Sequence, residues 1–238
     1  MLLDSIETKE RILSEFLKIC PFEGWTKAAL NLAVRNSNIS ESFVDLIFEN
    51  GCLDLAEFYI KSQNEKAAKQ IAEIENFHSR KIRDKIRLSL YARIDVEKDH
   101  QIVLQRLINF YLDPKNFIHF EVGAKPMIQA LKSCYKISDF IWKEINDQST
   151  DFNFYTKRLT LAKIILRTLL VFTKDDSENS LKTKNFIDSQ ISKVMKFEQR
   201  KMQLKKMLNT TFLDENGTPK NPKEIIKNLP FFRLIKFK

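Results

Sequence analysis

Few residues of this chain have the types and spacing that catalysis or metal binding needs. Glu75 and His78 form one E-x-x-H pair, the spacing with which a helix supplies ligands to a di-iron centre. Such a centre needs two such pairs and two further carboxylates that all project inward. Glu97 and His100 repeat the spacing, whereas His119 has no glutamate three residues before it, and this pattern arises easily by chance in a helical chain rich in glutamate. Phosphate-binding glycine loops and nucleophile elbows are not found either. The sequence therefore predicts no catalytic residue, no metal ligand and no cofactor, and favours a protein that is not an enzyme.

The cysteines do not change this view. Cys20, Cys52 and Cys134 are scattered and have no C-x-x-C spacing. They lie in apolar helical patterns, where a cysteine is usually an inert, buried thiol. We therefore expect three free thiols in a reducing compartment.

The elements that must position any site are predicted to be helices. The chain has 238 residues, of which 43% are hydrophobic, but it has only 4 Gly and 6 Pro. These are too few for the turns of an all-β sandwich or barrel. No apolar stretch approaches the ~20 residues that span a bilayer. Apolar spacing predicts three short helices in the first fifty residues. They are separated by Pro21 and Gly24 and by a turn near 37–39, and Gly51 follows the third. One long helix is predicted over 53–94, and further helices over 99–112, 117–122, 126–145, 152–172 and 180–207.

The first fifty residues have the outline of a helix-turn-helix. Thr26 and Ser40 are predicted to cap its second and third helices, and Gly51 is placed to end the third in a left-handed conformation. A DNA reader needs cations on its docking face, because phosphate neutralisation dominates affinity. The segment 41–50, which would be the recognition helix, carries three acidic residues and no basic one. The sequence therefore disfavours nucleic acid as a partner.

Charge is distributed unevenly along the chain. Residues 1–60 contain five basic and ten acidic side chains, whereas residues 193–238 contain twelve basic and four acidic ones. The end of the chain mixes cations with aromatic and aliphatic residues, a composition that favours an anionic lipid surface. Pro230 interrupts a single amphipathic helix, so a segment folded back onto the body stays open as an alternative. The residues predicted to bind a membrane are Lys227, Phe231, Phe232, Arg233, Leu234, Ile235, Lys236 and Phe237.

The predicted helix over 152–172 is apolar around most of its circumference. Such a helix must be buried on most sides. It is either an ordinary core helix, the wall of an apolar ligand cavity, or a helix at a subunit interface. Periodicity leaves these three interpretations open.

Residues 149–158 make the sequence recognisable. They read S-T-D-F-N-F-Y-T-K-R and resemble the S-T-D-F-N-W-Y-T-[KR]-R signature of the ubiquinone biosynthesis lipid-binding proteins, the ninth-named factor of the coenzyme Q pathway. Phe154 stands where the family usually has tryptophan. Residues 21–26, P-F-E-G-W-T, resemble the family's P-F-[DE]-G-W-[ST], and residues 51–55, G-C-L-D-L, resemble its G-x-x-D-L. Trp142 precedes the signature at the expected distance.

The resemblance implies a fold and a domain organisation. The fold is all-α and similar to that of the tetracycline-repressor family. It has a three-helix N-terminal module followed by a larger helical ligand-binding bundle, and it often forms a homodimer. On this basis we expect a helix-turn-helix-like module without DNA-binding charge over 1–50, a lipid-binding domain over 51–207 and a basic amphipathic tail over 208–238.

The resemblance also implies a function. Members bind isoprenoid quinone intermediates or phospholipid and present the intermediate to the di-iron demethoxyubiquinone hydroxylase at a membrane surface. By match to the signature, Phe154 and Tyr155 would lie in an exposed patch that docks the hydroxylase, and Asp151 would cap the helix. The apolar faces predict that the lipid contacts Met127, Leu131, Phe140, Ile165 and Leu169.

Two other functions remain as alternatives. A ligand-responsive transcriptional regulator of the tetracycline-repressor family would bind a DNA duplex through residues 26–50. A stand-alone hydroxylase would bind stoichiometric iron. The N-terminus has neither a cationic, apolar leader nor an Arg-rich transit pattern. We therefore expect a bacterial form that is cytoplasmic and peripheral at the inner face of the cytoplasmic membrane.

Overall fold

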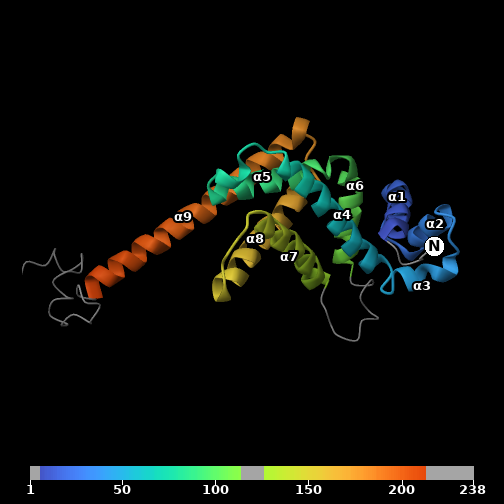
Figure 1. Ribbon diagram of the computed structural model, residues 1–238, viewed down its shortest axis with the longest axis horizontal. Helices are drawn as coiled ribbons and strands as arrows, with labels where there is room; N and C mark the ends of the chain where they lie inside the picture. Colours follow the sequence, from blue (N-terminus) through green and yellow to red (C-terminus); the bar gives the residue numbers. More distant parts are fainter. Residues whose placement is uncertain (1–5, 114–125, 213–238) are drawn as a thin grey trace, which may run out of the picture. The chain divides into compact units, whose positions relative to one another are not determined.

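The computed structural model describes residues 6–113 and 126–212, without the side chains of residues 126, 127, 129, 151 and 204–212. Every regular element assigned within these ranges is a helix, which confirms the all-α prediction for this part of the chain (Figure 1). The predicted helix over 117–122 lies outside the described residues, and the closer likeness to the tetracycline-repressor fold stays a prediction. The elements, with η for 3-10 helices, are α1 (Ile6–Glu23), α2 (Lys27–Asn36), η1 (Glu41–Phe43), α3 (Val44–Ile47), α4 (Cys52–Ala72), η2 (Phe77–Ser79), α5 (Ile82–Asp95), η3 (Lys98–His100), α6 (Gln101–Leu112), α7 (Pro126–Glu144), α8 (Asp151–Phe172), η5 (Glu178–Ser180) and α9 (Leu181–Phe212).

The prediction of one helix over 53–94 is wrong. The structure divides this stretch into α4 and α5, with the 3-10 turn η2 between them. Asn76 has a φ of +56°, in the left-handed region that a right-handed helix cannot contain. Phe77, directly after it, is buried. Its apolar side chain therefore belongs to a packed turn, although its spacing matches a helical pattern.

The prediction that Pro21 ends the first helix is also wrong, because Pro21 lies in the last turn of α1. A proline there removes only one hydrogen bond, so the helix tolerates it near its end. Gly24 stops the helix instead, with a φ of +70° and an N–H that donates to the carbonyl of Cys20 at 2.9 Å. Thr26 then begins α2 as predicted, because its hydroxyl accepts from the N–H of Ala29 at 3.1 Å.

The helix-turn-helix outline has a very short third helix. Ser40 caps it as predicted, but η1 and the four-residue α3 together replace the longer recognition helix. Gly51 has the predicted positive φ of +55°, but it precedes α4 as its N-cap and α3 already ends at Ile47, so the prediction that Gly51 ends the third helix is wrong. The acidic residues of this segment face cations of α2. Arg35 pairs with Glu41 at 2.9 Å, and Lys27 lies 4.0 Å from Asp45. These pairs leave the segment with little cationic surface for phosphate groups.

Trp25 attaches the N-terminal helices to the rest of the bundle. It is buried, and its indole N–H donates to the carbonyl of Val103 in α6 at 3.0 Å. Its ring contacts Phe16 and Tyr59, with centroid distances of 4.8 and 5.9 Å. The P-F-E-G-W-T segment therefore serves packing: it turns the chain at Gly24 and places this indole between α1, α4 and α6.

The chain forms two compact units that divide between Asp188 and Ser189, inside α9. The first unit holds α1 to α8 and the first residues of α9. Within it α7 and α8 pack against each other, and α1 contacts both α2 and α6 (Figure 1). The predicted domain boundaries near residues 50 and 207 stay predictions. In the part of the chain that the structure describes, none of the helices is long and apolar enough to cross a membrane.

Candidate functional site

The signature segment ends the turn between α7 and α8 and forms the first turns of α8. We call residues 139–158, which include the end of α7, the α7–α8 corner. Asn146 takes a left-handed φ of +64°, which lets the chain reverse direction after α7. Thr150 occupies the N-cap position of α8 without a side-chain hydrogen bond, and Asp151 is the first helical residue. The prediction of Asp151 as the cap is therefore wrong by one residue. The corner does not depend on a side-chain cap, because buried ion pairs hold it.

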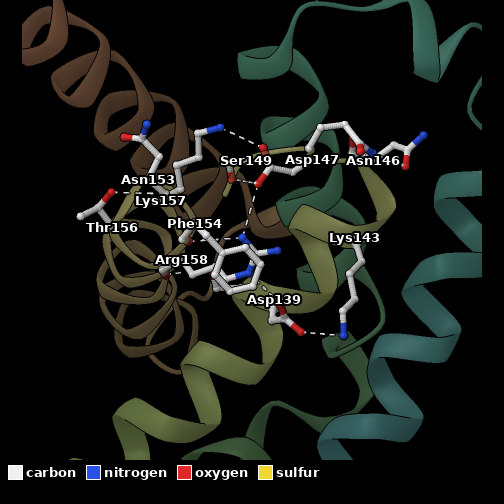
Figure 2. Close-up of polar contacts among 12 residues, drawn as sticks. Asp139, Lys143, Asn146, Asp147, Ser149, Asn153, Phe154, Thr156, Lys157 and Arg158 are labelled. Carbon is white, nitrogen blue, oxygen red and sulfur yellow. Dashed lines mark hydrogen bonds and ion pairs between the residues drawn. The ribbon is translucent and has the colours of Figure 1, made fainter. Parts of the chain in front are cut away.

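Arg158 lies at the centre of the α7–α8 corner (Figure 2). Its side chain is only 3% exposed. Its Nε donates to Asp139 Oδ1 at 2.7 Å, and its Nη1 donates to Asp147 Oδ2 at 3.4 Å and to the carbonyl of Phe154 at 3.3 Å. The guanidinium carbon lies 3.4 Å from the centroid of the Phe154 ring, in a cation–π contact. One arginine thus joins α7, the turn and the first turns of α8.

Asp147 is the second centre of the corner. Its side chain is almost fully buried, and it accepts hydrogen bonds from Lys157 Nζ at 2.8 Å and from the hydroxyl of Ser149 (Figure 2). Lys157 Nζ also lies 5.1 Å from the ring centroid of Trp142. The indole N–H of Trp142 is buried and has no hydrogen-bond partner among the described residues. Ser149, Lys157 and Arg158 of the signature therefore serve the internal structure of the corner.

The ion pairs set the protonation state of both carboxylates. Burial alone would raise the pKa of Asp139, but the hydrogen bonds and charges of Arg158 and Lys143 outweigh it, so the pKa is lowered. Burial would also raise the pKa of Asp147, but the hydrogen bonds from Lys157 and Ser149 outweigh it, so this pKa is lowered too. Both groups are carboxylates at neutral pH, so each faces a cation in its charged form.

A third carboxylate stabilises the next turn of the chain. Asp175 accepts hydrogen bonds from the N–H of Ser177 at 2.9 Å and from the N–H and hydroxyl of Thr183 at 2.7 and 2.5 Å. Burial works against the charged form, but the hydrogen bonds from Ser177 and Thr183 are stronger and lower the pKa of Asp175 to about 2. This carboxylate connects the end of α8 to the start of α9.

We expect acid to unfold the first unit through these carboxylates. An Asp with a lowered folded-state pKa stabilises the fold above its unfolded pKa of about 4, and this contribution is lost as the pH falls through the folded value. The free energy of unfolding should therefore be nearly constant above about pH 5 and fall between about pH 4 and about pH 2. Urea unfolding, followed by circular dichroism at each pH, measures this. In Asp175→Asn the free energy of unfolding should fall less steeply with decreasing pH. An unchanged dependence on pH would contradict the role of Asp175.

The start of α8 exposes an apolar face, defined here as Phe152, Tyr155 and Leu159. These side chains are 79%, 59% and 42% exposed, and their i, i+3, i+7 spacing places them on one side of the helix. Tyr155 is thus exposed as predicted, but Phe154 is half-buried against Arg158. Phe152 was not predicted, although its spacing to Tyr155 and Leu159 was visible in the sequence. Exposed aromatic groups of this kind mark interaction surfaces.

The residues predicted to contact lipid occupy several environments. Ile165 and Leu169 are buried on α8, and Leu131 and Phe140 are half-buried on α7. The side chain of Met127 lies outside the described residues, as do residues 227–237, which were predicted to bind a membrane. Leu169 borders a cavity of about 30 Å³ among α4, α6, α7 and α8. This is far below the ~300 Å³ of small ligand sites, so in this structure the helices pack closely around it.

A buried charge cluster borders the same cavity and was missed in the sequence. Arg93 pairs with Glu97 at 2.5 Å, and its Nε donates to Asn64 Oδ1 at 3.1 Å. The hydroxyl of Tyr59 donates to Glu97, which is fully buried. Burial, and then the charge of Glu97, raises the pKa of Tyr59 well above its usual value. Arg93 and Tyr59 line the cavity and give it a polar end. The i, i+4 spacing of Arg93 and Glu97 was a signal, but it is also common on exposed helices.

The groups first considered for catalysis lie in unsuitable surroundings. Glu75 lies in a turn and His78 in η2, and within residues 6–113 and 126–212 no cluster of three or more potential metal ligands forms. The three cysteines are free and buried, as predicted. Burial raises the pKa of each thiol to about 12, so all three are protonated at neutral pH and weakly nucleophilic.

Comparison with known proteins identifies the family that the chain resembles. The COQ9 family model matches residues 127–198, which include nearly all of α7, the whole of α8 and the start of α9. The α7–α8 corner thus lies inside the matched segment. The mitochondrial ubiquinone biosynthesis protein COQ9 of Bos taurus is 25% identical over 201 residues, which are 84% of this chain and 61% of that protein. The chain is thus similar to the COQ9 family in the segment that contains the signature, and to its members over most of its length. This confirms the resemblance found in the signature.

Other relatives agree with this assignment. COQ9 of Homo sapiens is 23% identical over 205 residues, 84% of this chain and 61% of that protein. The probable ubiquinone biosynthesis protein coq9 of Dictyostelium discoideum is 24% identical over 195 residues, 80% of this chain and 60% of that protein. The chain therefore spans about three fifths of the length of the curated relatives that it matches.

Proposed function

We propose that this chain is a non-enzymatic accessory protein of ubiquinone biosynthesis. It binds an isoprenoid lipid and presents a quinone intermediate to the demethoxyubiquinone hydroxylase at a membrane. Similarity to the COQ9 family supports the pathway. The observation that carries the accessory role is the exposed apolar face of α8, which a rigid, ion-paired corner holds at the start of the helix.

The apolar face has the properties of a protein docking site. Phe152 and Tyr155 offer two large rings to solvent, and aromatic residues supply much of the energy at protein interfaces. Arg158 is buried one turn away and fixes the backbone from which both rings project. The surface is therefore preorganised, so ordering it on binding costs a partner little affinity.

The lipid role follows from the C-terminal half of the same helix. Leu166 and Leu169 of α8 border the cavity, whose remaining lining comes chiefly from apolar residues of α4, α6 and α7. Each methylene withdrawn from water contributes ~0.8 kcal/mol, so an isoprenoid leaves a bilayer only for an apolar interior. Because the cavity holds about 30 Å³ in this structure, we propose that the lipid binds by separating α7 and α8 from α4 and α6. The polar end at Arg93 and Tyr59 would then face the quinone ring.

Native mass spectrometry and lipid extraction of the purified full chain test this function. We expect an isoprenoid lipid to copurify with the wild type. Leu169→Phe reduces the cavity and should lower lipid recovery severalfold, because overpacking a filled site costs roughly 1–3 kcal/mol. The adjacent Leu170→Phe is the matched control, because Leu170 is exposed. The absence of any lipid from the wild type, or equal losses in both variants, would contradict the proposal.

The place of action and the oligomeric state are also proposals. The relatives named above are mitochondrial proteins, and the cytoplasmic location predicted for this chain stays a prediction. We propose that the chain works as a homodimer at the surface of the membrane that makes ubiquinone, with residues 227–237 in contact with lipid. The regulator alternative gains no support, because the described N-terminal module pairs its α2 cations with acidic residues.

A further inference from the structure

The described part of the second unit carries a line of cations on α9. Lys193, Lys196 and Arg200 follow one another at i, i+3 and i+7, which places them on one side of the helix. All three are exposed, and none has an ion-pair partner among the described residues. Lys201 lies at the edge of this side, four residues after Phe197, but it is 4.0 Å from Glu198 and its charge is partly matched. The three cations therefore present their charge to solvent.

An aromatic residue lies within this line of charge. Phe197 follows Lys193 by four residues and precedes Arg200 by three, so it shares their side of α9. Its side chain is 64% exposed. We call the four residues Lys193, Lys196, Phe197 and Arg200 the basic stripe. The exposed Met202 lies on a different side of the helix and is not part of it.

We propose that the basic stripe binds the surface of a membrane that contains anionic phospholipid. The three cations complement phosphate and carboxylate headgroups, and an exposed phenyl ring inserts at the boundary between headgroups and acyl chains. A straight helix can lay such a stripe along a flat surface over its whole length. Nucleic acid or an acidic protein would use the charges but would gain less from Phe197. The site is separate from residues 227–237 and does not depend on the proposed function.

The charge of the stripe predicts a large effect on vesicle binding. Each Lys or Arg near an anionic leaflet changes the partition coefficient about fivefold, so three together change it roughly 100-fold. The triple variant Lys193→Gln, Lys196→Gln, Arg200→Gln should lose this factor on vesicles of equimolar phosphatidylcholine and phosphatidylserine. On phosphatidylcholine alone it should bind as weakly as the wild type. Cosedimentation of the full chain with each vesicle measures both partition coefficients.

A matched control separates the stripe from the net charge. Lys66, Lys69 and Lys132 are exposed on α4 and α7 and have no ion-pair partner among the described residues. Their change to glutamine removes the same charge from the first unit and should alter vesicle binding less than threefold. A second pair tests the ring: Phe197→Gln should weaken binding severalfold, whereas Met202→Gln, at 67% exposure, should have little effect.

Three results would overturn the proposal. Equal losses in the stripe variant and the first-unit control would show that only net charge matters. A stripe variant that binds like the wild type, while Lys227→Gln, Arg233→Gln, Lys236→Gln loses binding, would assign the membrane contact to residues 227–237 alone. Binding of a DNA duplex that depends on the stripe, without any dependence on vesicles, would make nucleic acid the ligand. Loss of vesicle binding leaves the lipid recovery test of the proposed function unchanged, so the two can fail separately.

Discussion

Replacing Arg158 with methionine is expected to lower the free energy of unfolding by about 3–5 kcal/mol, the usual cost of removing one partner from a buried ion pair. The change removes the 2.7 Å hydrogen bond from Arg158 to Asp139. It also leaves the buried Asp147 with Lys157 as its only cationic partner among the described residues. It also removes the cation–π contact with Phe154. Urea unfolding of the full chain, followed by circular dichroism, measures the loss.

Lys143→Met is the matched control for this prediction. Lys143 pairs with Asp139 at 2.8 Å, but its side chain is 71% exposed. Exposed pairs contribute little, so we expect a loss of no more than ~1 kcal/mol. Arg158→Lys should fall between the two, because lysine lacks the planar fork that reaches both carboxylates and stacks on a ring. Equal stabilities of Arg158→Met and Lys143→Met would show that the corner does not depend on the buried arginine.

Replacing both Phe152 and Tyr155 with aspartate is expected to weaken binding to the proposed partner, the demethoxyubiquinone hydroxylase, roughly 1000-fold. Central aromatic residues at interfaces contribute about 2 kcal/mol or more each, and every 1.4 kcal/mol is tenfold in affinity. Both rings are exposed in the free protein, so their loss should change the free energy of unfolding little. Calorimetric titration with the hydroxylase of the same organism gives the affinity.

Two further variants make this result specific. Phe22→Asp with Leu181→Asp removes two exposed apolar side chains from α1 and α9, and should leave the affinity within about threefold of the wild type. Phe154→Leu removes the ring beneath Arg158 and should mainly lower stability, by ~1 kcal/mol. If Phe154→Leu reduced affinity as strongly as the aspartate pair, Phe154 would be a docking residue, as the signature predicts for Phe154 and Tyr155.

Local features of the chain were predictable from the sequence. Thr26 and Ser40 begin their helices as predicted, because a cap depends only on its own side chain and on a backbone N–H two or three residues further along. The limits of α8 were predicted within one residue, since its apolar pattern is long and charged residues end it. The burial of the cysteines followed from the apolar helical patterns around them. The signature was likewise sufficient to find the family that the chain resembles.

Contacts between distant residues were not predictable in this way. Nothing near Phe154 in the sequence shows that Asp139 and Asp147 draw Arg158 inward and that its guanidinium then covers the ring. The turn at Asn76 was hidden for a similar reason, because the burial of Phe77 depends on its packing and not on helical spacing. Side-chain exposure results from the packing of whole helices, whereas periodicity describes one helix at a time. For this reason the sequence located the candidate segment, but the packing of α7 against α8 determined which of its aromatic residues reach solvent.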